Sequence, residues 1–296
     1  MQPRLSVVIA SVNGLGCILE CLEKLEALPE RRQMEIIVLD RRTDNTADVI
    51  AERFPDVVLF RGLTGKSIPE LRWQGMQAAA GEIVAIIEDH CMVLPGWATE
   101  VLRRVGPEYS VVGGPVENGS TERLIDWAFF LAEYGPCMPP LPEGPAEWVP
   151  GNNAAYRRRF LPLQEPQWAG LWESFLQNEL RKRGLRIYLS PAMLIYHKKS
   201  FRLGEMLAQR FLYSRSFAAM RAKEMDSAQR RRYVLLSFAL PAVLLGRIWR
   251  CVSQKRRNRR EFLLGLPIII LFVISWAVGE MVGYIAGPGD SLARVE

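Results

Sequence analysis

Four short apolar runs in the first ninety residues constrain the fold more than any other feature of this chain. Unbroken runs of this kind are typical of parallel strands that are buried on both faces. They are "LSVVIA" (Leu5–Ala10), "EIIVLD" (Glu35–Asp40), "VVLF" (Val57–Phe60) and "EIVAII" (Glu82–Ile87). Helical patterns at residues 18–28 and 68–80 lie between them. We therefore predict an α/β fold built on an open, doubly wound sheet.

The polar residues that follow these runs predict where a ligand binds. In open α/β sheets, ligands bind beyond the carboxyl ends of the strands. Ser11 and Asn13 follow the first run, Asp40 ends the second, and Glu88–His90 follow the fourth. We predict that a nucleotide lies across these ends, with Asp40 accepting hydrogen bonds from a ribose or base edge. A cation at the fourth end would neutralise phosphate charge.

An incomplete dinucleotide fingerprint overlaps the first of these strand ends. Gly14 and Gly16 have the spacing of its first two glycines, and Asp40 stands where its ribose acceptor would stand. Leu19 replaces the third glycine. A dinucleotide enzyme also has no use for the Glu-x-His pair at the fourth strand end, so this interpretation is the less favoured one.

The last part of the chain is apolar enough to enter a membrane. Phe262–Gly279 contains 18 residues without a charge, which at about 1.5 Å per residue covers most of a bilayer core of about 30 Å. We predict a span over residues 262–286. Tyr233–Trp249 is shorter and contains a proline and an arginine. A re-entrant or interfacial helix is favoured there over a second span, because a two-span hairpin would place the basic residues 255–260 outside, against the positive-inside rule.

Positive charge is concentrated beside these apolar segments. The formal net charge is +6, and Arg230–Arg232 and Lys255–Arg260 supply much of it. Such clusters favour anionic lipid headgroups, and no recognised nucleic-acid module is present. Residues 202–232 predict a basic amphipathic helix that either lies on the membrane or packs on the globular domain. The amino terminus lacks a signal-type core, so we expect the domain at residues 1–201 to lie on the cytoplasmic face of the inner membrane.

Five motifs, in this order and spacing, resemble those of family 2 glycosyltransferases, whose fold is called GT-A. They are "LSVVIASVNG", "EIIVLDRRTDNTADVI", "LRWQGMQAAAGEIVAIIEDHCMVLPGW", "WVPGNNAAYRRRFL" and "WESFLQNELRKRGLRIYLSPAMLIYH". The resemblance covers about two-thirds of the chain. It implies inverting transfer of a sugar from a UDP- or GDP-sugar donor. With the basic membrane-proximal helices, it suggests a lipid-linked or membrane-proximal glycan as acceptor.

The resemblance also assigns residues to the donor nucleotide. Asp40 falls where the family has its nucleotide-reading aspartate, and Arg72 matches an arginine near the donor. Ser11, Asn13 and Asp89 complete the expected nucleotide site. Asp44 corresponds to a second acid in the same turn as Asp40, and capping of the next helix is the alternative role for it.

The family's metal motif is Asp-x-Asp, set nine residues before an aromatic residue. Counting back from Trp97 places Glu88 and His90 at the two aspartates. His197 stands where members often have a histidine near metal or phosphate. Both residue types ligate divalent cations, so Mn²⁺ or Mg²⁺ is expected. Asp89 in place of His90, a solvated strand end, and a structural role for His197 are the alternatives.

The resemblance places a catalytic carboxylate eleven residues before the glycine that ends a helix. Counting back from Gly184 gives Glu173, which we expect to act as the general base, with Glu179 as the second choice. Asn152 and Asn153 match a turn that borders donor sugar and acceptor, although asparagine is also a common turn former.

Arg210 or Arg215 is expected to contact a lipid phosphate of the acceptor. Because both standard aspartates of the metal motif are replaced, a membrane-tethered scaffold on a decayed transferase fold is the alternative function. Nucleotidyl transfer on a similar sheet is another.

Overall fold

The computed structural model describes residues 2–296 and divides the chain into two compact units. The first unit comprises the residues up to Glu117 together with Cys137–Lys198, and the second comprises Asn118–Pro136 together with Lys199–Glu296. The expected boundary near Phe201 lies close to the second junction. Residues 118–136, which the sequence analysis assigned to the globular domain, belong to the second unit.

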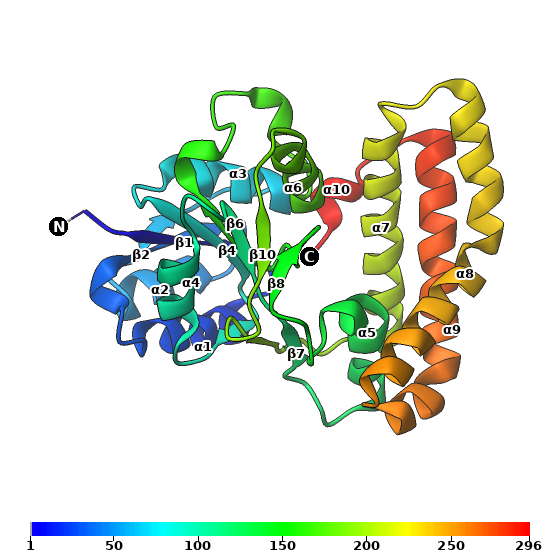
Figure 1. The fold of residues 1–296 in the computed structure, drawn as a ribbon, viewed down its shortest axis with the longest axis horizontal. Coiled ribbons are helices and arrows are strands. Elements are labelled where there is room, and N and C mark those ends of the chain that lie inside the picture. Colours follow the sequence, from blue (N-terminus) through cyan, green and yellow to red (C-terminus); the bar gives the residue numbers. More distant parts are fainter. Residues whose placement is uncertain (1) are drawn as a thin grey trace. The chain divides into compact units, whose positions relative to one another are not determined.

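The first unit is built on an eight-stranded sheet of order β3-β2-β1-β4-β9-β6-β10-β8. Four strands match the apolar runs of the sequence: β1 (Leu5–Ser11), β2 (Met34–Asp40), β3 (Val58–Phe60) and β4 (Ile83–Glu88). They pair in parallel, and all seven residues of β1 are buried. The predicted α/β class with an open sheet is therefore confirmed (Figure 1).

The other half of this sheet is mixed. β9 (Asn153–Arg157) pairs antiparallel with β4 and with β6 (Val111–Gly113). β10 (Ile187–Leu189) is parallel to β6, whereas β8 (Gly144–Ala146) is antiparallel to β10. A separate three-stranded sheet has the order β5-β11-β7, formed by Cys91–Val93, Ile195–His197 and Val116–Asn118.

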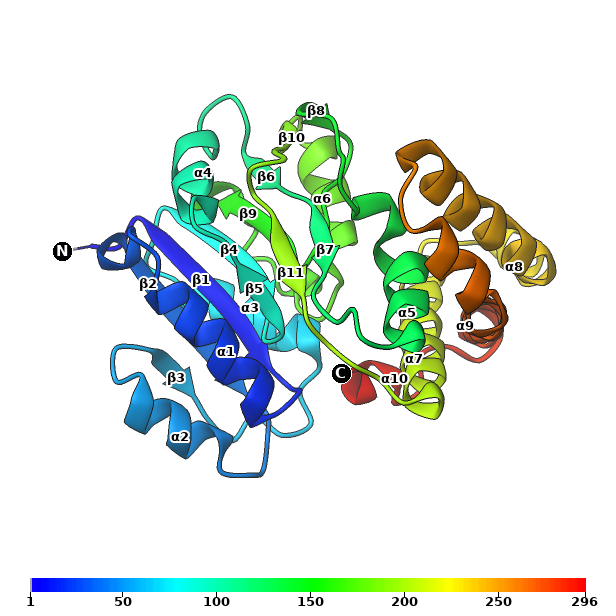
Figure 2. The ribbon, with the colours of Figure 1, turned by 90° about the horizontal axis from the view of Figure 1, so that it is seen from below.

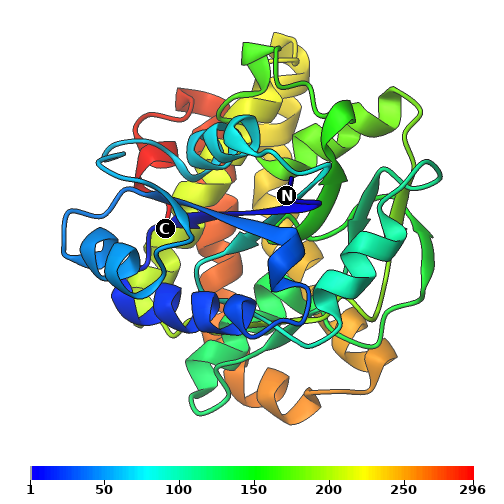
Figure 3. The same ribbon diagram turned by 90° about the vertical axis from the view of Figure 1, so that its left-hand side faces the viewer.

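Helices cover both faces of the large sheet. They are α1 (Leu15–Glu26), α2 (Thr46–Arg53), α3 (Ile68–Ala78), α4 (Trp97–Arg104) and α6 (Glu173–Lys182). The dark blue helix α1 and the cyan helix α3 lie on opposite sides of β1 (Figures 1 and 3). Short 3₁₀ turns lie at Arg31–Gln33, Arg158–Phe160 and Pro166–Trp168.

Helix α3 begins at a complete capping box, which fixes where it leaves the sheet. The Ser67 hydroxyl accepts from the Glu70 N–H at 3.4 Å, and the Glu70 carboxylate accepts from the Ser67 N–H at 2.8 Å. These contacts satisfy amide groups that a helix start leaves without partners. Arg72 follows on the first turns of α3 and is only 3% exposed, so the cap sets the position of a buried charge.

The second unit is helical. It contains α5 (Leu124–Tyr134), α7 (Leu203–Ala222), α8 (Ser227–Lys255), α9 (Arg259–Ala286) and α10 (Ser291–Arg294), with a 3₁₀ turn at Gly135–Cys137. Helix α9 lies between α7 and α8 and also contacts α5 (Figures 1 and 2). Ser275 donates to the Leu207 carbonyl and Arg221 donates to the Tyr284 hydroxyl, so α7 and α9 run in the same direction.

Two glycines allow α7 and α9 to approach closely. A Cβ at Gly279 would overlap Ser214 and the Phe211 backbone, and a Cβ at Gly283 would overlap the Arg215 carbonyl. Two small residues four positions apart are a common helix-packing device in membrane proteins. Helix α7 thus packs against α9 within the helical unit, where Met206, Ala218 and Ala219 are among its buried residues.

Helices α8 and α9 are long and apolar enough to cross a membrane by length and composition. They have 29 and 28 residues, with mean hydropathies of 1.6 and 2.5 over their most apolar windows. Helix α8 continues through Pro241 and extends beyond the predicted 233–249 segment on both sides. Arg256 and Asn258 adopt left-handed backbone conformations at the bend between the two helices. The basic cluster at residues 255–260 thus forms the bend of a helical hairpin.

Candidate metal and nucleotide site

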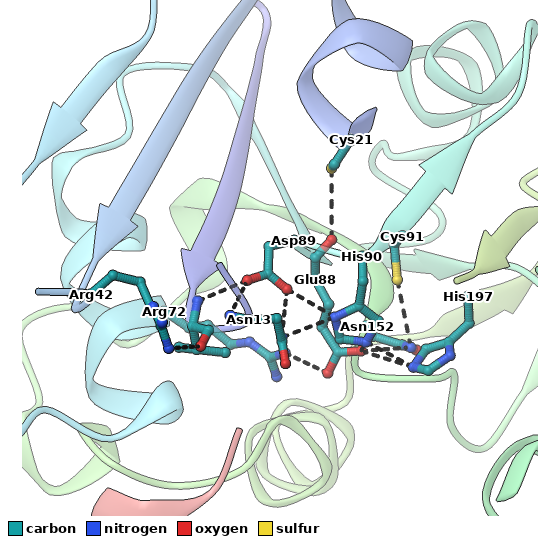
Figure 4. A network of polar contacts seen from close by, with 11 residues as sticks. Asn13, Cys21, Arg42, Arg72, Glu88, Asp89, His90, Cys91, Asn152 and His197 are labelled. Carbon is teal, nitrogen blue, oxygen red and sulfur yellow. Dashed lines mark hydrogen bonds and ion pairs between the residues drawn. The ribbon is translucent and has the colours of Figure 1, made fainter. Parts of the chain in front are cut away.

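Strand register brings the two histidines of the chain together. His90 lies two residues after the end of β4 and just before β5, and His197 ends β11, whose antiparallel register sets His197 opposite Cys91 of β5. Their Nε2 atoms are 2.8 Å apart, and the rings meet edge to face at 88°. The Glu88 Oε2 lies 3.3 Å from the His90 Nε2 and 3.9 Å from the His197 Nε2 (Figure 4).

The donor set at this cluster fits a divalent cation. Metal–ligand bonds of about 2.1 Å at right angles place neighbouring ligand atoms about 3 Å apart. The three donor atoms here lie within 4.8 Å of one another. One carboxylate and two imidazoles form a mixed oxygen and nitrogen set that first-row divalent ions accept. Glu88, His90 and His197 can therefore hold a metal ion with little rearrangement.

The cluster continues through Arg72 to Glu173. Arg72 Nη2 lies 3.0 Å from Glu88 Oε1, and Arg72 Nη1 lies 2.7 Å from Glu173 Oε1. Glu173 is 6% exposed at the first turn of α6. A Cβ at Gly151 would lie 2.9 Å from the Glu173 Oε2, so a larger residue there would require the Glu173 side chain to shift. One arginine thus joins the candidate metal ligand to the candidate base.

Charges within the cluster oppose the cost of burying it. Burial raises the pKa of Glu88, but contacts with His90 and Arg72 outweigh it and hold that pKa well below its ordinary value. Burial lowers the pKa of His90, whereas the Asp89 and Glu88 carboxylates raise it, and the net direction is upward. A nearby opposite charge favours the charged form of each group, so the carboxylates stay ionised beside the cationic side chains.

Asp89 is fully buried and points toward the end of β1. Its carboxylate accepts from the Val12 and Asn13 N–H groups at 2.7 and 2.8 Å. It also contacts the Asn13 side-chain amide at 2.7 Å and the His90 Nδ1 at 2.8 Å. Both carboxylate oxygens are thus engaged within the protein. Direct nucleotide contact by Asp89 stays a prediction.

Asp40 lies at the neighbouring strand end, where β1 and β2 place it opposite Ser11. Its Oδ1 accepts from the Arg42 N–H at 3.4 Å, and its Oδ2 is buried without a hydrogen-bond partner. Burial raises the pKa of this carboxyl. A buried carboxylate with one oxygen left over suits the N–H or O–H groups of a ligand.

Asp44 in the same turn is used locally. It accepts from the Thr46 N–H at 3.1 Å at the start of α2, and it pairs with Arg42 at 2.9 Å. The Thr46 and Arg42 contacts lower its pKa to about 2. Asp44 thus contacts the first residue of α2 from the position before the N-cap, Asn45.

The two asparagines of the glycine turn differ in position. Asn152 Nδ2 donates to Glu88 Oε2 at 3.1 Å, and its buried Oδ1 has no hydrogen-bond partner. Asn153 is fully buried, accepts from the Trp97 indole at 3.0 Å, and donates to the Pro115 and Met193 carbonyls. Asn152 thus joins the cluster, whereas the polar groups of Asn153 tie the core together.

Arg210 belongs to the helical unit. It is 4% exposed, pairs with Glu133, and stacks on Trp276 with 3.8 Å between the guanidinium carbon and the ring centroid. Arg215 donates to the Gly287 carbonyl at 2.9 Å. Both arginines thus have contacts within their own unit, although the Nε and Nη2 of Arg210 are buried without a hydrogen-bond partner.

Sequence reasoning missed Gln177. This buried residue, one turn after Glu173, accepts from the Val149 N–H at 3.0 Å and donates to the Val149 carbonyl and the Tyr156 hydroxyl. It therefore anchors the chain just before the turn that contains Gly151 and Asn152. An amide on the apolar face of α6 was the available signal.

A known protein family matches the part of the chain that contains most of these strand ends. The model of the family described as Glycosyl transferase family 2 matches residues 6–161, more than half of the chain. The chain belongs to glycosyltransferase family 2. The matched segment contains the ends of β1, β2 and β4, and with them Asp40, Glu88, His90 and Asn152.

Two curated relatives of this family 2 glycosyltransferase are named as polypeptide N-acetylgalactosaminyltransferases. Polypeptide N-acetylgalactosaminyltransferase 12 of Mus musculus is 30% identical over 137 residues, which are 43% of this chain and 23% of that protein. Probable polypeptide N-acetylgalactosaminyltransferase 8 of Homo sapiens is 28% identical over 126 residues, or 38% and 20%. The matched region thus spans less than a quarter of either relative.

A solved structure shares the fold of this glycosyltransferase over nearly its whole length. The mannosyltransferase PcManGT of Pyrobaculum calidifontis, determined in complex with GDP-Man and Mn²⁺, has a TM-score of 0.60 and 17% identity. The match covers 95% of this chain and 88% of that chain. The predicted GT-A fold is confirmed by this likeness.

Proposed function

We propose that this protein transfers a sugar from a nucleotide-sugar donor, a UDP- or GDP-sugar, to an acceptor held near a membrane. The observation that carries the proposal is the convergence of Glu88, His90 and His197 with Arg72 and Glu173 at the carboxyl end of β4. Family membership supports the reaction class. The complex of PcManGT with GDP-Man and Mn²⁺ supports a nucleotide sugar and a divalent cation.

Three residues would hold the cation, namely Glu88, His90 and His197. When bound, a divalent ion supplies a Lewis acid that stabilises negative charge on a departing diphosphate. Asn152 donates to the same Glu88 oxygen that faces both histidines and orients it. Asp40, with its unpartnered buried oxygen, would accept hydrogen bonds from the ribose or base of the donor.

Glu173 is proposed as the general base of an inverting transfer. Its carboxylate would take the proton of an acceptor hydroxyl as that oxygen bonds to the anomeric carbon and the bond from that carbon to the diphosphate oxygen breaks. Arg72 orients the carboxylate through their 2.7 Å ion pair and balances its charge.

The helical unit is proposed to attach the protein to the inner membrane, with the first unit on the cytoplasmic face. Exposed apolar side chains on α8 and α9 support contact with lipid; they include Leu235, Phe238, Val243, Leu263 and Ile285, each at least 59% exposed. The hairpin of α8 and α9 has its basic bend at residues 255–260. A lipid-linked or membrane-proximal glycan is the acceptor that such an attachment favours.

Screening of nucleotide sugars tests this function. The full chain, in a mild detergent, is heated with each of a panel of UDP- and GDP-sugars in the presence and absence of Mn²⁺. We expect one donor to raise the melting temperature and to release its nucleoside diphosphate only with the metal. Binding without release under every condition would favour the scaffold alternative. Pyrophosphate release from a nucleoside triphosphate would favour nucleotidyl transfer.

A matched pair of variants links that result to the site. Glu88→Gln should abolish the metal-dependent release. Glu108→Gln changes a 67% exposed side chain that pairs with Arg186, and it should release the diphosphate as the wild type does.

A further inference from the structure

The fully buried carboxylate of Asp89 joins two parts of the candidate site. On one side it binds the backbone N–H groups of Val12 and Asn13, which lead out of β1. On the other side it contacts the Nδ1 of His90. The Asp89 side chain thereby connects the residues after β4 to Val12, which lies 77 positions earlier in the chain.

Four donors converge on this carboxylate, two on each oxygen. Val12 and Asn13 N–H groups meet Oδ2, whereas the Asn13 amide and the His90 Nδ1 meet Oδ1. An ionised carboxylate can accept from all four, because it has only acceptor sites. An asparagine cannot accept from all four. In one orientation of its amide, the NH₂ group would face the two backbone N–H groups. In the other, it would face the Asn13 amide and the His90 Nδ1.

Two groups lie at the Nδ1 of His90, the Asp89 Oδ1 at 2.8 Å and the Asn13 side-chain nitrogen at 3.1 Å. The Asn13 amide lies nearer to Asp89 Oδ1, at 2.7 Å, so the carboxylate determines what His90 presents on its other side. With the Nδ1 proton held by Asp89, the Nε2 lone pair faces Glu88 and His197, as a metal ligand requires. An amide donating to Nδ1 would favour the opposite tautomer, with a proton on the Nε2. That proton would block ligation.

We propose that Asp89 is a positioning residue that holds the Nε2 of His90 toward the metal site and couples it to the Val12–Asn13 turn. The inference rests on the proposed metal site, and it gives Asp89 a role other than direct contact with the nucleotide. A shift of the Val12–Asn13 turn on nucleotide binding would then move the Asp89 side chain and, with it, the metal ligand His90.

Manganese binding to the full chain tests this role without turnover. Free Mn²⁺ is titrated by electron paramagnetic resonance against the wild type, Asp89→Asn and Asp126→Asn. Asp126 is a matched control, because it is 2% exposed and accepts from the Phe201 N–H and the Ser200 hydroxyl of the helical unit. We expect Asp89→Asn to weaken Mn²⁺ binding by about 10- to 100-fold and Asp126→Asn to leave it unchanged.

The tautomer of His90 provides a second readout. The chain has only 2 histidines, so a protein labelled with ¹⁵N-histidine gives one pair of ring-nitrogen signals from each of them, and His197→Gln assigns the pairs. Above neutral pH and without metal, we expect His90 to carry its proton on Nδ1 in the wild type and to lose that preference in Asp89→Asn. A role in packing alone would not move the tautomer.

The outcomes separate this inference from the function it rests on. Wild-type affinity together with the wild-type tautomer in Asp89→Asn would overturn the positioning role and leave the metal site standing. Failure of the wild type to bind Mn²⁺ would overturn the metal site and the inference together. Should Asp89→Asn not fold, Asn13→Ala removes one donor to Asp89 and is expected to weaken Mn²⁺ binding by a smaller factor. Unchanged binding in Asn13→Ala would then count against the coupling.

Discussion

The Nε2 of His90 lies 2.8 Å from the Nε2 of His197, although the two residues are 107 positions apart in the chain. Both rings are nearly buried, and Glu88 faces them from the end of β4. Two ring nitrogens at this distance share one proton or one cation, since two lone pairs would repel each other. The pair is therefore arranged to hold one proton or one metal ion between its two Nε2 atoms.

Removal of His197 tests that conclusion. His197→Ala takes away one of three metal ligands without touching β4, and we expect Mn²⁺ affinity to fall by more than about 100-fold, beyond the effect of an outer-shell change. Donor hydrolysis should fall with it. Titration calorimetry with Mn²⁺ measures the first effect. Affinity equal to that of the wild type would exclude His197 as a ligand.

The second prediction concerns Glu173 and the chemical step. Glu173→Gln keeps the size of the side chain but cannot accept a proton, so we expect the transfer rate to fall by about 10²- to 10⁴-fold. Donor affinity should stay within a few-fold of the wild type, because Arg72 remains paired with Glu88. Single-turnover transfer and equilibrium donor binding separate the two quantities.

Glu179 provides the control for that experiment. It lies on the same helix, α6, and pairs with Arg183 at 2.8 Å. Glu179→Gln should retain transfer. The reverse result, with activity retained in Glu173→Gln and lost in Glu179→Gln, would move the base to Glu179.

The residues at strand ends could be predicted from sequence, because strand direction alone fixes where they gather. Asp40 and Glu88 each end a parallel strand that an apolar run identifies, and the counted motif spacing selected His90 and Glu173. The contacts on which the proposed role of Asp89 rests were not accessible in this way. It depends on which backbone groups its side chain meets, and residue spacing does not record that.

The packing of α5 against α9 could not be predicted from the sequence either. The segment at residues 118–136 lies within the first half of the chain, yet α5 contacts α9. Phe129 packs against Phe272, with ring centroids 5.9 Å apart. An apolar helix has the same local pattern whichever partner it meets, so its assignment to the helical unit required the tertiary structure.

Because of the buried carboxylate of Glu100, we expect the stability of the first unit to depend on pH. It is nearly buried and accepts from the Ser190 hydroxyl at 2.6 Å and from Arg103 and Arg104. Burial raises its pKa, but these donors outweigh burial, and the pKa in the folded protein is lowered. A lowered folded-state pKa means that the carboxylate stabilises the fold above the unfolded value of about 4.3 and loses this effect as the pH falls through the folded value.

Glu100→Gln should therefore lower the urea midpoint at neutral pH, and its difference from the wild type should shrink as the pH falls below about 4. Tryptophan fluorescence follows the unfolding, since the buried Trp97 begins the same helix. Glu108→Gln, at an exposed ion pair, should match the wild type throughout. A difference for Glu100→Gln that persists unchanged to low pH would exclude this carboxylate as its source.

The close approach of α7 and α9 gives the last prediction. Gly279→Leu would drive a side chain into Ser214 and the Phe211 backbone of α7. Overpacking of this kind typically costs about 1–3 kcal/mol, so we expect a lower melting temperature for the full chain in detergent. Gly246→Leu is the matched control, because a Cβ at Gly246 on α8 meets nothing within 4 Å. It should melt at or slightly above the wild-type temperature, since leucine favours helix over glycine. Equal melting temperatures for the two variants would mean that the contact between α7 and α9 does not support the helical unit.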